Sequence, residues 1–229
     1  MKRFLLVSVF LILFILFAAG TLTLFKHYST FSTIITDTSC NPPCWHTIQP
    51  GQTFMWDAVS ILVNMQNVGT IMQWEERYGD KISWNFRYPV KESSGYIYCT
   101  DKKVMAISLL TYGSLTVAEA LERFGEPDYS WTRYKETIDR LWLEIILVYP
   151  TKGIFVRVEI KLPNSTQSVS AIHMDGNNPV GRVIYIDPIQ YEYLLSSRIL
   201  FREDEQTILE RLQPWQGLGE VSYEHLVPD

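Results

Sequence analysis

The chain has 229 residues, 47% of them hydrophobic and 20% charged, a composition typical of folded proteins that argues against large-scale disorder. The formal net charge is −5, and the Lys and Arg residues form no block anywhere in the sequence. Binding to a phosphate backbone needs clustered positive side chains, so the sequence argues against nucleic acid as a partner.

The N-terminal segment predicts a membrane anchor. Lys2 and Arg3 precede an uncharged apolar run over residues 4–25, close to the ~20 residues that cross a bilayer as a helix. The basic start favours a cytoplasmic N-terminus, which places the C-terminal domain on the extracytoplasmic side of the cell membrane. The alternative is a signal cleaved after Gly20, since Ala18 and Gly20 have the small-residue spacing of a cleavage site, and the protein is then secreted.

A polar spacer over residues 26–39 leads to the stretch "SCNPPCWHTIQPGQT". Outside the membrane the compartment is oxidising, so its cysteines are disulfide candidates. We predict a Cys40–Cys44 bridge, because the prolines between the two cysteines restrict a small ring. A Cys44–Cys99 bridge is the alternative, and reduced thiols are a third. The four histidines are scattered, so we expect no metal site and no cofactor.

Two segments resemble each other: "IQPGQTFMWDAVSIL" from residue 48 and "LTYGSLTVAEALERF" from residue 110. In the second, Thr116 and Glu119 have capping-box spacing, and Gly125 ends the amphipathic stretch that follows. In the first, Thr53 is the expected N-cap. Each segment therefore predicts a short helix.

Strand-like runs follow each predicted helix. After the first come "KISWNFRYP", "GYIYCT" and "KVMAISLL", with a hairpin turn at Asp101 and Lys102. After the second come "RLWLEIILVYP", "GIFVRVEIKLP" and "SVSAIHM", then a weaker strand "RVIYI" and a helix "EDEQTILERLQ". In residues 154–161, apolar and polar side chains alternate as in a half-buried strand.

These elements predict an α+β fold with an N-terminal transmembrane helix and two helix-plus-antiparallel-meander units. The expected divisions are an anchor or signal over residues 1–25, a spacer over 26–39, a first repeat over 40–110, and a second repeat with a C-terminal helix and tail over 111–229.

The repeated pattern resembles the repeats of β-lactamase-inhibitor proteins and of the small BamE/SmpA-like lipoprotein of the outer-membrane barrel-assembly machine. The residues that carry this resemblance are Gly113, Thr116, Glu119, Ala120, Phe124, Gly125 and Pro127, with Gly51, Thr53, Asp57, Ala58 and Leu62 in the first copy. The resemblance implies a layered α+β fold and, by analogy, a binding role in the bacterial envelope.

No catalytic signature is present, neither a nucleophile elbow, nor a zinc-protease motif, nor a glycine-rich phosphate loop. The polar segment "HMDGNN", residues 173–178, predicts a hairpin turn, because Gly and Asn tolerate a positive φ. We therefore expect no enzyme and no catalytic residues. A hydrolase acting on envelope polymers is the least favoured alternative, because sequence alone does not exclude a carboxylate pair across a cleft.

We expect a binding protein whose aromatic side chains contact the ligand. Tyr129 and Trp131, which follow the polar "GEPD", and Trp215 in the C-terminal tail are the candidate binding residues, whereas Trp142, between two leucines, is expected in the core. The predicted partner is an envelope protein, alongside the lipid bilayer through residues 4–25. A cell-wall glycan is the alternative, because the same aromatic rings stack on sugars.

Overall fold

The computed structural model describes residues 13–15, 17, 40–76, 79–87, 94–137, 140–162, 171–191 and 205–222. Within that part of the chain, no helix is both long enough and apolar enough to cross a membrane. Most of the apolar run over residues 4–25, and the whole spacer over residues 26–39, lie outside the described residues.

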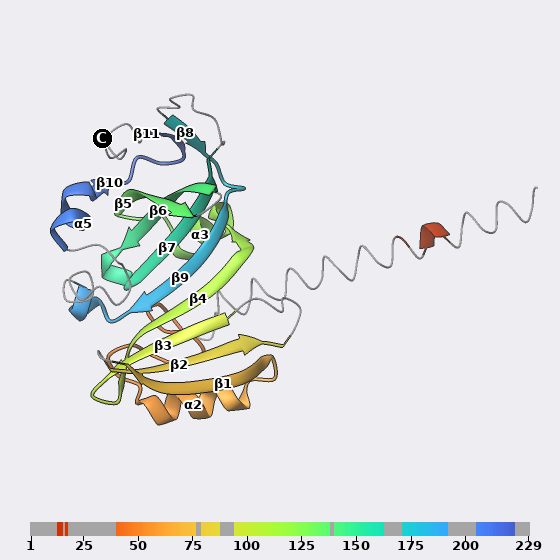
Figure 1. The fold of residues 1–229 in the computed structure, drawn as a ribbon, viewed down its shortest axis with the longest axis vertical. Helices are drawn as coiled ribbons and strands as arrows, with labels where there is room; N and C mark the ends of the chain where they lie inside the picture. The colour runs from red at the N-terminus through yellow and green to blue at the C-terminus, as the bar shows by residue number, and fades with distance from the viewer. Residues whose placement is uncertain are drawn as a thin grey trace, which may run out of the picture.

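The described residues form one large antiparallel sheet of nine strands, in the order β1-β2-β3-β4-β9-β7-β6-β5-β10 (Figure 1). Their bounds are β1 Val68–Glu76, β2 Gly79–Phe86, β3 Ser94–Thr100, β4 Lys103–Thr116, β5 Tyr129–Thr137, β6 Arg140–Tyr149, β7 Ile154–Lys161, β9 Pro179–Ile186 and β10 Gln213–Pro214. Strand β8, Ala171–Met174, pairs separately with β11, Gly219–Ser222.

The helices within the described residues are short. They are α2 Met55–Asn64, α3 Val117–Phe124 and α5 Glu205–Arg211, with single 3₁₀ turns η1 Pro150–Lys152 and η2 Pro188–Gln190. Helices α2 and α3 both bury side chains in one hydrophobic cluster, so they cover the same face of the sheet.

The predicted fold class is therefore wrong. The expected units, residues 40–110 and 111–229, do not form two meanders, because β4 crosses the boundary between them and pairs with β3 along one edge and β9 along the other. A free strand edge is unfavourable because its N–H and C=O groups are unpaired. In the continuous sheet both edges of β4 are paired, one with β3 and the other with β9. The result is a sheet-dominated fold with few helices and, among the described residues, no membrane-spanning helix.

The helix ends show where local sequence was sufficient. Thr116 and Glu119 form the predicted capping box, with the Thr116 N–H donating to Glu119 Oε2 at 2.8 Å, and Gly125 ends α3 with a φ of 77°. Thr53 is not the N-cap of α2. That position belongs to Phe54, whose apolar side chain makes no cap. The Thr53 hydroxyl is engaged elsewhere, because its Oγ1 accepts from the Gln49 N–H at 2.8 Å.

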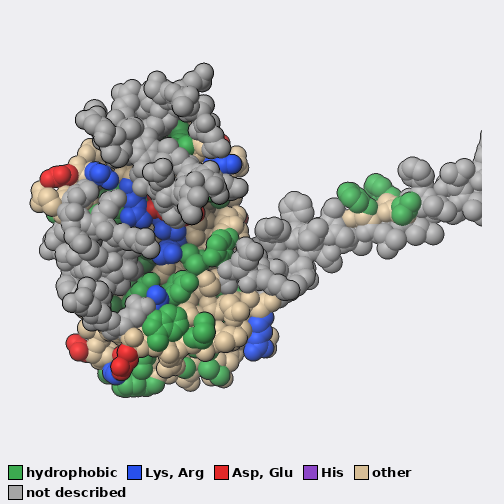
Figure 2. All heavy atoms as spheres, viewed as in Figure 1, with side chains coloured by type: hydrophobic (Ala, Val, Ile, Leu, Met, Phe, Trp, Pro, Cys, Tyr) green, Lys and Arg blue, Asp and Glu red, His purple; other side chains and the backbone are tan. Residues whose placement is uncertain are grey.

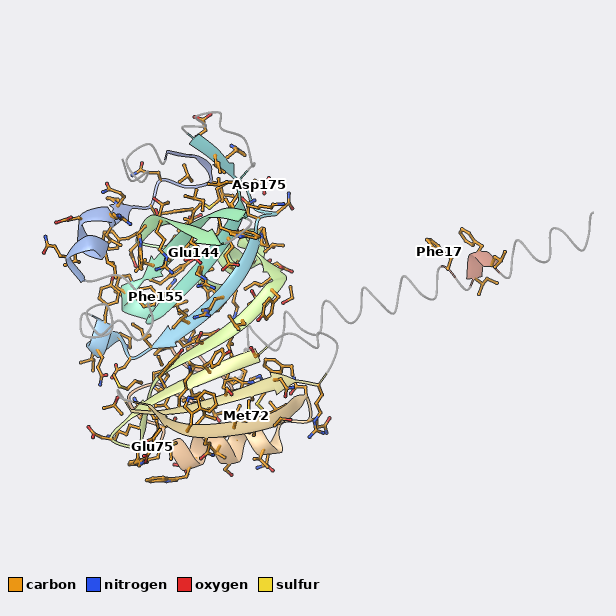
Figure 3. The ribbon with its side chains drawn as sticks, in the orientation of Figure 1. Phe17, Met72, Glu75, Glu144, Phe155 and Asp175 are labelled. Atoms are coloured by element: carbon orange, nitrogen blue, oxygen red, sulfur yellow. A yellow bond between two sulfur atoms is a disulfide. The ribbon has the colours of Figure 1, made fainter. Side chains whose placement is uncertain are left out.

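Two predicted turns are also present. Asp101 and Lys102 adopt positive φ values of 51° and 61° between β3 and β4. Residues Asp175–Asn178 turn between β8 and β9, with the Asn178 N–H donating to the Asp175 carbonyl at 3.2 Å (Figure 3). This second turn is not a hairpin, because β8 pairs with β11 and not with β9.

The main core lies between the sheet and helices α2 and α3. Trp84 of β2 is 1% exposed and stacks on the fully buried Trp45 at a centroid distance of 5.4 Å. Cys40 and Cys44, just before Trp45, are joined by a disulfide as predicted, with their Cα atoms 5.7 Å apart, and Cys99 is a buried free thiol. The entry segment is thus held against the core of the domain.

A second, smaller core lies on the opposite face of the sheet. It is formed by Trp131, Ile146, Phe155 and neighbouring apolar residues of the sheet, and Ile208 of α5 packs into it with no exposed surface. The C-terminal helix therefore covers only one part of this face.

Candidate functional site

The candidate site is on the sheet face opposite α2 and α3, which we call the open face. Strands β1 to β3 carry polar and aromatic side chains on this face. So do the parts of β5, β6, β7 and β9 that the second core does not occupy. Figure 2 shows Lys and Arg side chains gathered along the middle of the face in view, with hydrophobic side chains beside them. The side chains drawn in Figure 3 include Glu144 on the upper strands and Met72 on β1 at the lower edge.

A chain of ion pairs crosses β5, β6 and β7. Arg133 and Glu144 are direct cross-strand neighbours, and Arg133 Nη2 lies 2.6 Å from Glu144 Oε2. Arg157 Nη1 lies 3.5 Å from Glu144 Oε1, and its Nη2 lies 2.8 Å from Glu159 Oε1. The Glu144 side chain has no exposed surface, so it depends on these two arginines for its charge compensation.

Arg182 of β9 lies directly opposite Arg157 of β7. Its half-buried guanidinium makes no hydrogen bond or ion pair with any residue in the described part of the chain, and its Nε is buried without a partner. Burial, followed by the like charge of Arg157, lowers the pKa of Arg182, while Tyr98, Tyr96 and Glu144 act in the opposite direction. Arg182 is therefore a cation held in a place that disfavours its charge.

A pocket of about 440 Å³ opens beside these arginines. Arg157, Glu159 and Arg182 supply its charged wall, and Leu110, Tyr112 and Trp142 supply apolar surface. Gly181 also lines it, and a Cβ at that position would lie 2.8 Å from Cδ of Glu159. The absence of a side chain at residue 181 is thus what allows the Glu159 carboxylate to lie over β9.

A second feature of the open face is a lysine–aromatic cluster on β1 to β3. Lys81 Nζ lies 5.4 Å from the ring centroid of Trp74, 5.0 Å from that of Tyr96 and 5.3 Å from that of Tyr98. Trp74 is 36% exposed, and Met72, on the same face of β1, is 55% exposed. This cluster presents an amphipathic, positively charged surface to solvent.

The predicted binding residues lie elsewhere. Trp131 is 1% exposed, and its ring lies in the second core and not on the surface as expected. Tyr129, at the start of β5, is 39% exposed and pairs with Pro214 of β10. Trp215 is half-buried against the main core, and its indole N–H donates to Glu126. Tyr129 and Trp215 thus lie at the β5–β10 edge and do not line the pocket.

Sequence reasoning did not single out the charged residues of the open face. Trp142 was expected in the core, yet it is half-buried and lines the pocket, because only alternate residues of β6 face the helices. Two signals pointed to the site: Glu144 is the single carboxylate in an apolar run, and Arg157 and Glu159 lie on the polar side of an alternating strand. The position of Arg182 opposite Arg157 had no such signal.

The described residues contain no group of three or more His, Cys, Asp and Glu side chains placed to hold a metal ion. The chemistry that the open face offers is therefore that of arginine, lysine and aromatic rings, which recognise carboxylates, phosphates and apolar or ring-bearing groups.

Comparison with known proteins gives no functional lead. No protein-family model matches the chain. No curated protein matches it either. Among solved structures, a cysteine-rich secretory protein from Staphylococcus aureus subsp. aureus Mu50 aligns with 8% sequence identity and a TM-score of 0.30, over 66% of this chain and 49% of that one. The aligned part thus spans about half of that protein, and a likeness this distant carries no argument about fold or function.

Proposed function

We propose that this protein is a non-catalytic, membrane-anchored binding protein whose domain lies on the extracytoplasmic side and contacts a partner protein of the cell envelope through the open face. The single observation that supports this most is the lysine–aromatic cluster. It places Trp74, which is 36% exposed, against the Lys81 cation, with Met72, 55% exposed, on the same face of β1.

The chemistry of the cluster fits a protein partner. Trp, Tyr and Met are enriched at protein interfaces, and aromatic anchors contribute a large part of binding energy. The chain as a whole carries a charge of −5, yet Lys and Arg side chains gather along the middle of the face seen in Figure 2. A partner surface with acidic residues around an apolar centre is complementary to it.

The sequence around the domain supports the location. The apolar run over residues 4–25 follows two basic residues, which favours a domain outside the cytoplasm. A disulfide such as Cys40–Cys44 persists in an oxidising compartment and is rare in a reducing cytosol. Both observations are consistent with anchoring at the membrane and exposure to the envelope.

The test uses the full-length protein in detergent as bait against solubilised envelope proteins and, in parallel, against purified cell wall. We compare the parent with Trp74→Ser, and use Trp56→Ser as the matched control, because Trp56 is 55% exposed but lies on α2, away from the open face. We expect an envelope protein to be retained by the parent and by Trp56→Ser, and its recovery to fall at least about 10-fold with Trp74→Ser, as for a central aromatic anchor.

Three outcomes would overturn the proposal. One is recovery that does not change with Trp74→Ser, which would place the contact elsewhere. Another is retention by purified wall and by no envelope protein, which would favour the glycan-binding alternative. The third is chemical turnover of an envelope polymer by the purified protein, which would make it a hydrolase.

A further inference from the structure

We propose that the pocket beside Arg157 and Arg182 is a binding site for the carboxylate or phosphate group of a small ring-bearing ligand. None of the described residues that line this pocket belongs to the lysine–aromatic cluster, and the proposal does not depend on the protein-binding role proposed above.

The charge of Arg182 has no partner among the described residues. Buried charges in proteins are nearly always paired, because an unpaired charge loses its hydration without compensation. Arg182 is half-buried, faces a second arginine across the strand pair, and makes no hydrogen bond or ion pair with any described residue. An oxyanion between Arg157 and Arg182 supplies the missing partner and also screens the repulsion between the two guanidinium groups.

The charges on the described wall of the pocket do not balance. Among its described lining residues the charged ones are Arg157, Arg182 and Glu159, which leaves one positive charge uncompensated. Glu144 and Arg133, just beyond the wall, compensate each other. Arg157 is already held by Glu144 and Glu159, so the excess charge resides on Arg182. A ligand group that carries a negative charge therefore completes the site.

The size and lining of the pocket fit a small ring-bearing molecule. A volume of about 440 Å³ falls in the range of small-molecule pockets, roughly 300–1,000 Å³. The rings of Tyr112 and Trp142 and the side chains of Leu110 and Pro179 give it apolar walls next to the charged one. Arginine offers planar, two-pronged donors that match a carboxylate or phosphate, and a ring-bearing body matches the apolar walls.

The experiment measures binding of three probes that share one ring to the full-length protein: benzoate, phenyl phosphate and uncharged benzamide. Ligand-observed NMR gives the affinity, and a thermal melt without probe gives the stability of the free protein. The variants are Arg182→Gln, Arg182→Lys and the control Lys103→Gln, whose exposed cation lies at the start of β4, outside the pocket.

We expect benzoate or phenyl phosphate to bind with a Kd of about 1 mM or tighter, and benzamide not to bind. Arg182→Gln is expected to weaken binding about 10- to 100-fold, the loss typical of a charge-assisted hydrogen bond. Arg182→Lys is expected to retain part of the affinity and Lys103→Gln all of it. The stronger of the two anionic probes identifies the ligand group as carboxylate or phosphate.

The melt separates a binding arginine from a structural one. Arg182→Gln removes an unpaired charge, so the free protein is expected to melt at a higher temperature than the parent, whereas a structural arginine would lower the melting temperature when removed. Failure of both anionic probes to bind the parent, equal binding of benzamide, or an Arg182→Gln variant that melts lower and binds benzoate and phenyl phosphate as the parent does would each overturn the proposal. None of these outcomes bears on the capture of an envelope protein through Trp74.

Discussion

Gly95→Ala tests how the main core is built across β2 and β3. Gly95 lies directly opposite Trp84, and the indole ring of Trp84 lies over its Cα. A Cβ at residue 95 would be 2.0 Å from Cζ2, 2.4 Å from Cε2 and 2.5 Å from Cη2 of that ring. Normal carbon contacts are about 3.5 Å, so the ring has to move by roughly 1.5 Å.

The surroundings of Trp84 leave it no free space for that movement. The ring is 1% exposed, stacks on Trp45 at 5.4 Å and meets Phe86 edge-on at 6.3 Å. Overpacking of this kind costs about 1–3 kcal/mol, and complete loss of the ring's packing costs about 3–5 kcal/mol. Alanine also lowers the conformational entropy of the unfolded chain, but this stabilises the protein by only about 0.4–1 kcal/mol.

We therefore expect Gly95→Ala to lower the free energy of unfolding by about 3 kcal/mol. For a domain of this size, that corresponds to a fall in melting temperature of roughly 6–12 °C. Urea unfolding followed by circular dichroism measures the first quantity, and a thermal melt measures the second. Ser94→Ala, at the neighbouring residue of β3, is the control and is expected to change stability by less than about 0.5 kcal/mol.

A double mutant makes the test specific to the ring. Trp84→Leu alone leaves a cavity and destabilises the protein, but it also frees the space above residue 95. Adding Gly95→Ala to Trp84→Leu is then expected to cost little, so the two changes couple by about 0.5–3 kcal/mol. A Gly95→Ala variant that melts with the parent, or two changes whose effects simply add, would refute the reasoning.

Other predictions follow from the ion-pair chain, the thiol and the helix cap. Glu144→Gln leaves Arg133 and Arg157 facing a neutral amide, and urea unfolding should show that the free energy of unfolding falls by about 3 kcal/mol. An unchanged unfolding midpoint would contradict a buried, charged carboxylate at this position. Burial and then Asp80 raise the pKa of Cys99 to about 12, so native protein should resist alkylation at pH 8 while protein in urea reacts, which mass spectrometry resolves. Because this folded-state pKa is raised, the free energy of unfolding should fall as the pH rises above the unfolded value of ~8.5 toward 12. Thr116→Ala should cost about 1 kcal/mol in a thermal or urea melt, and no change would mean that the cap contributes nothing.

Several local features of this protein were predictable from sequence because they depend on residues close together in the chain. The capping box joins residues three apart, the Asp101–Lys102 turn joins adjacent residues, and the disulfide joins residues four apart. Their geometry follows from backbone preferences and side-chain reach, with no need for a distant partner. Thr53 shows the limit of such rules, because a backbone N–H four residues away competes for its hydroxyl.

The fold class and the site depend on contacts between distant residues. Periodicity predicts that a segment is a strand but not which strand lies beside it, and the pairing of Ala106 with Ile186 joins two halves expected to be separate. The register of β7 with β9 places Arg182 opposite Arg157 and creates the uncompensated charge. Trp131 looked like a surface residue from its polar neighbours, but it is buried in a core formed with Ile146 on the neighbouring strand and Ile208 of α5. Sequence by itself thus determined the cap of α3, the Asp101–Lys102 turn and the disulfide. Tertiary structure decided the sheet order, the burial and the charges of the open face, because these arise from strand register and from segments far apart in the chain.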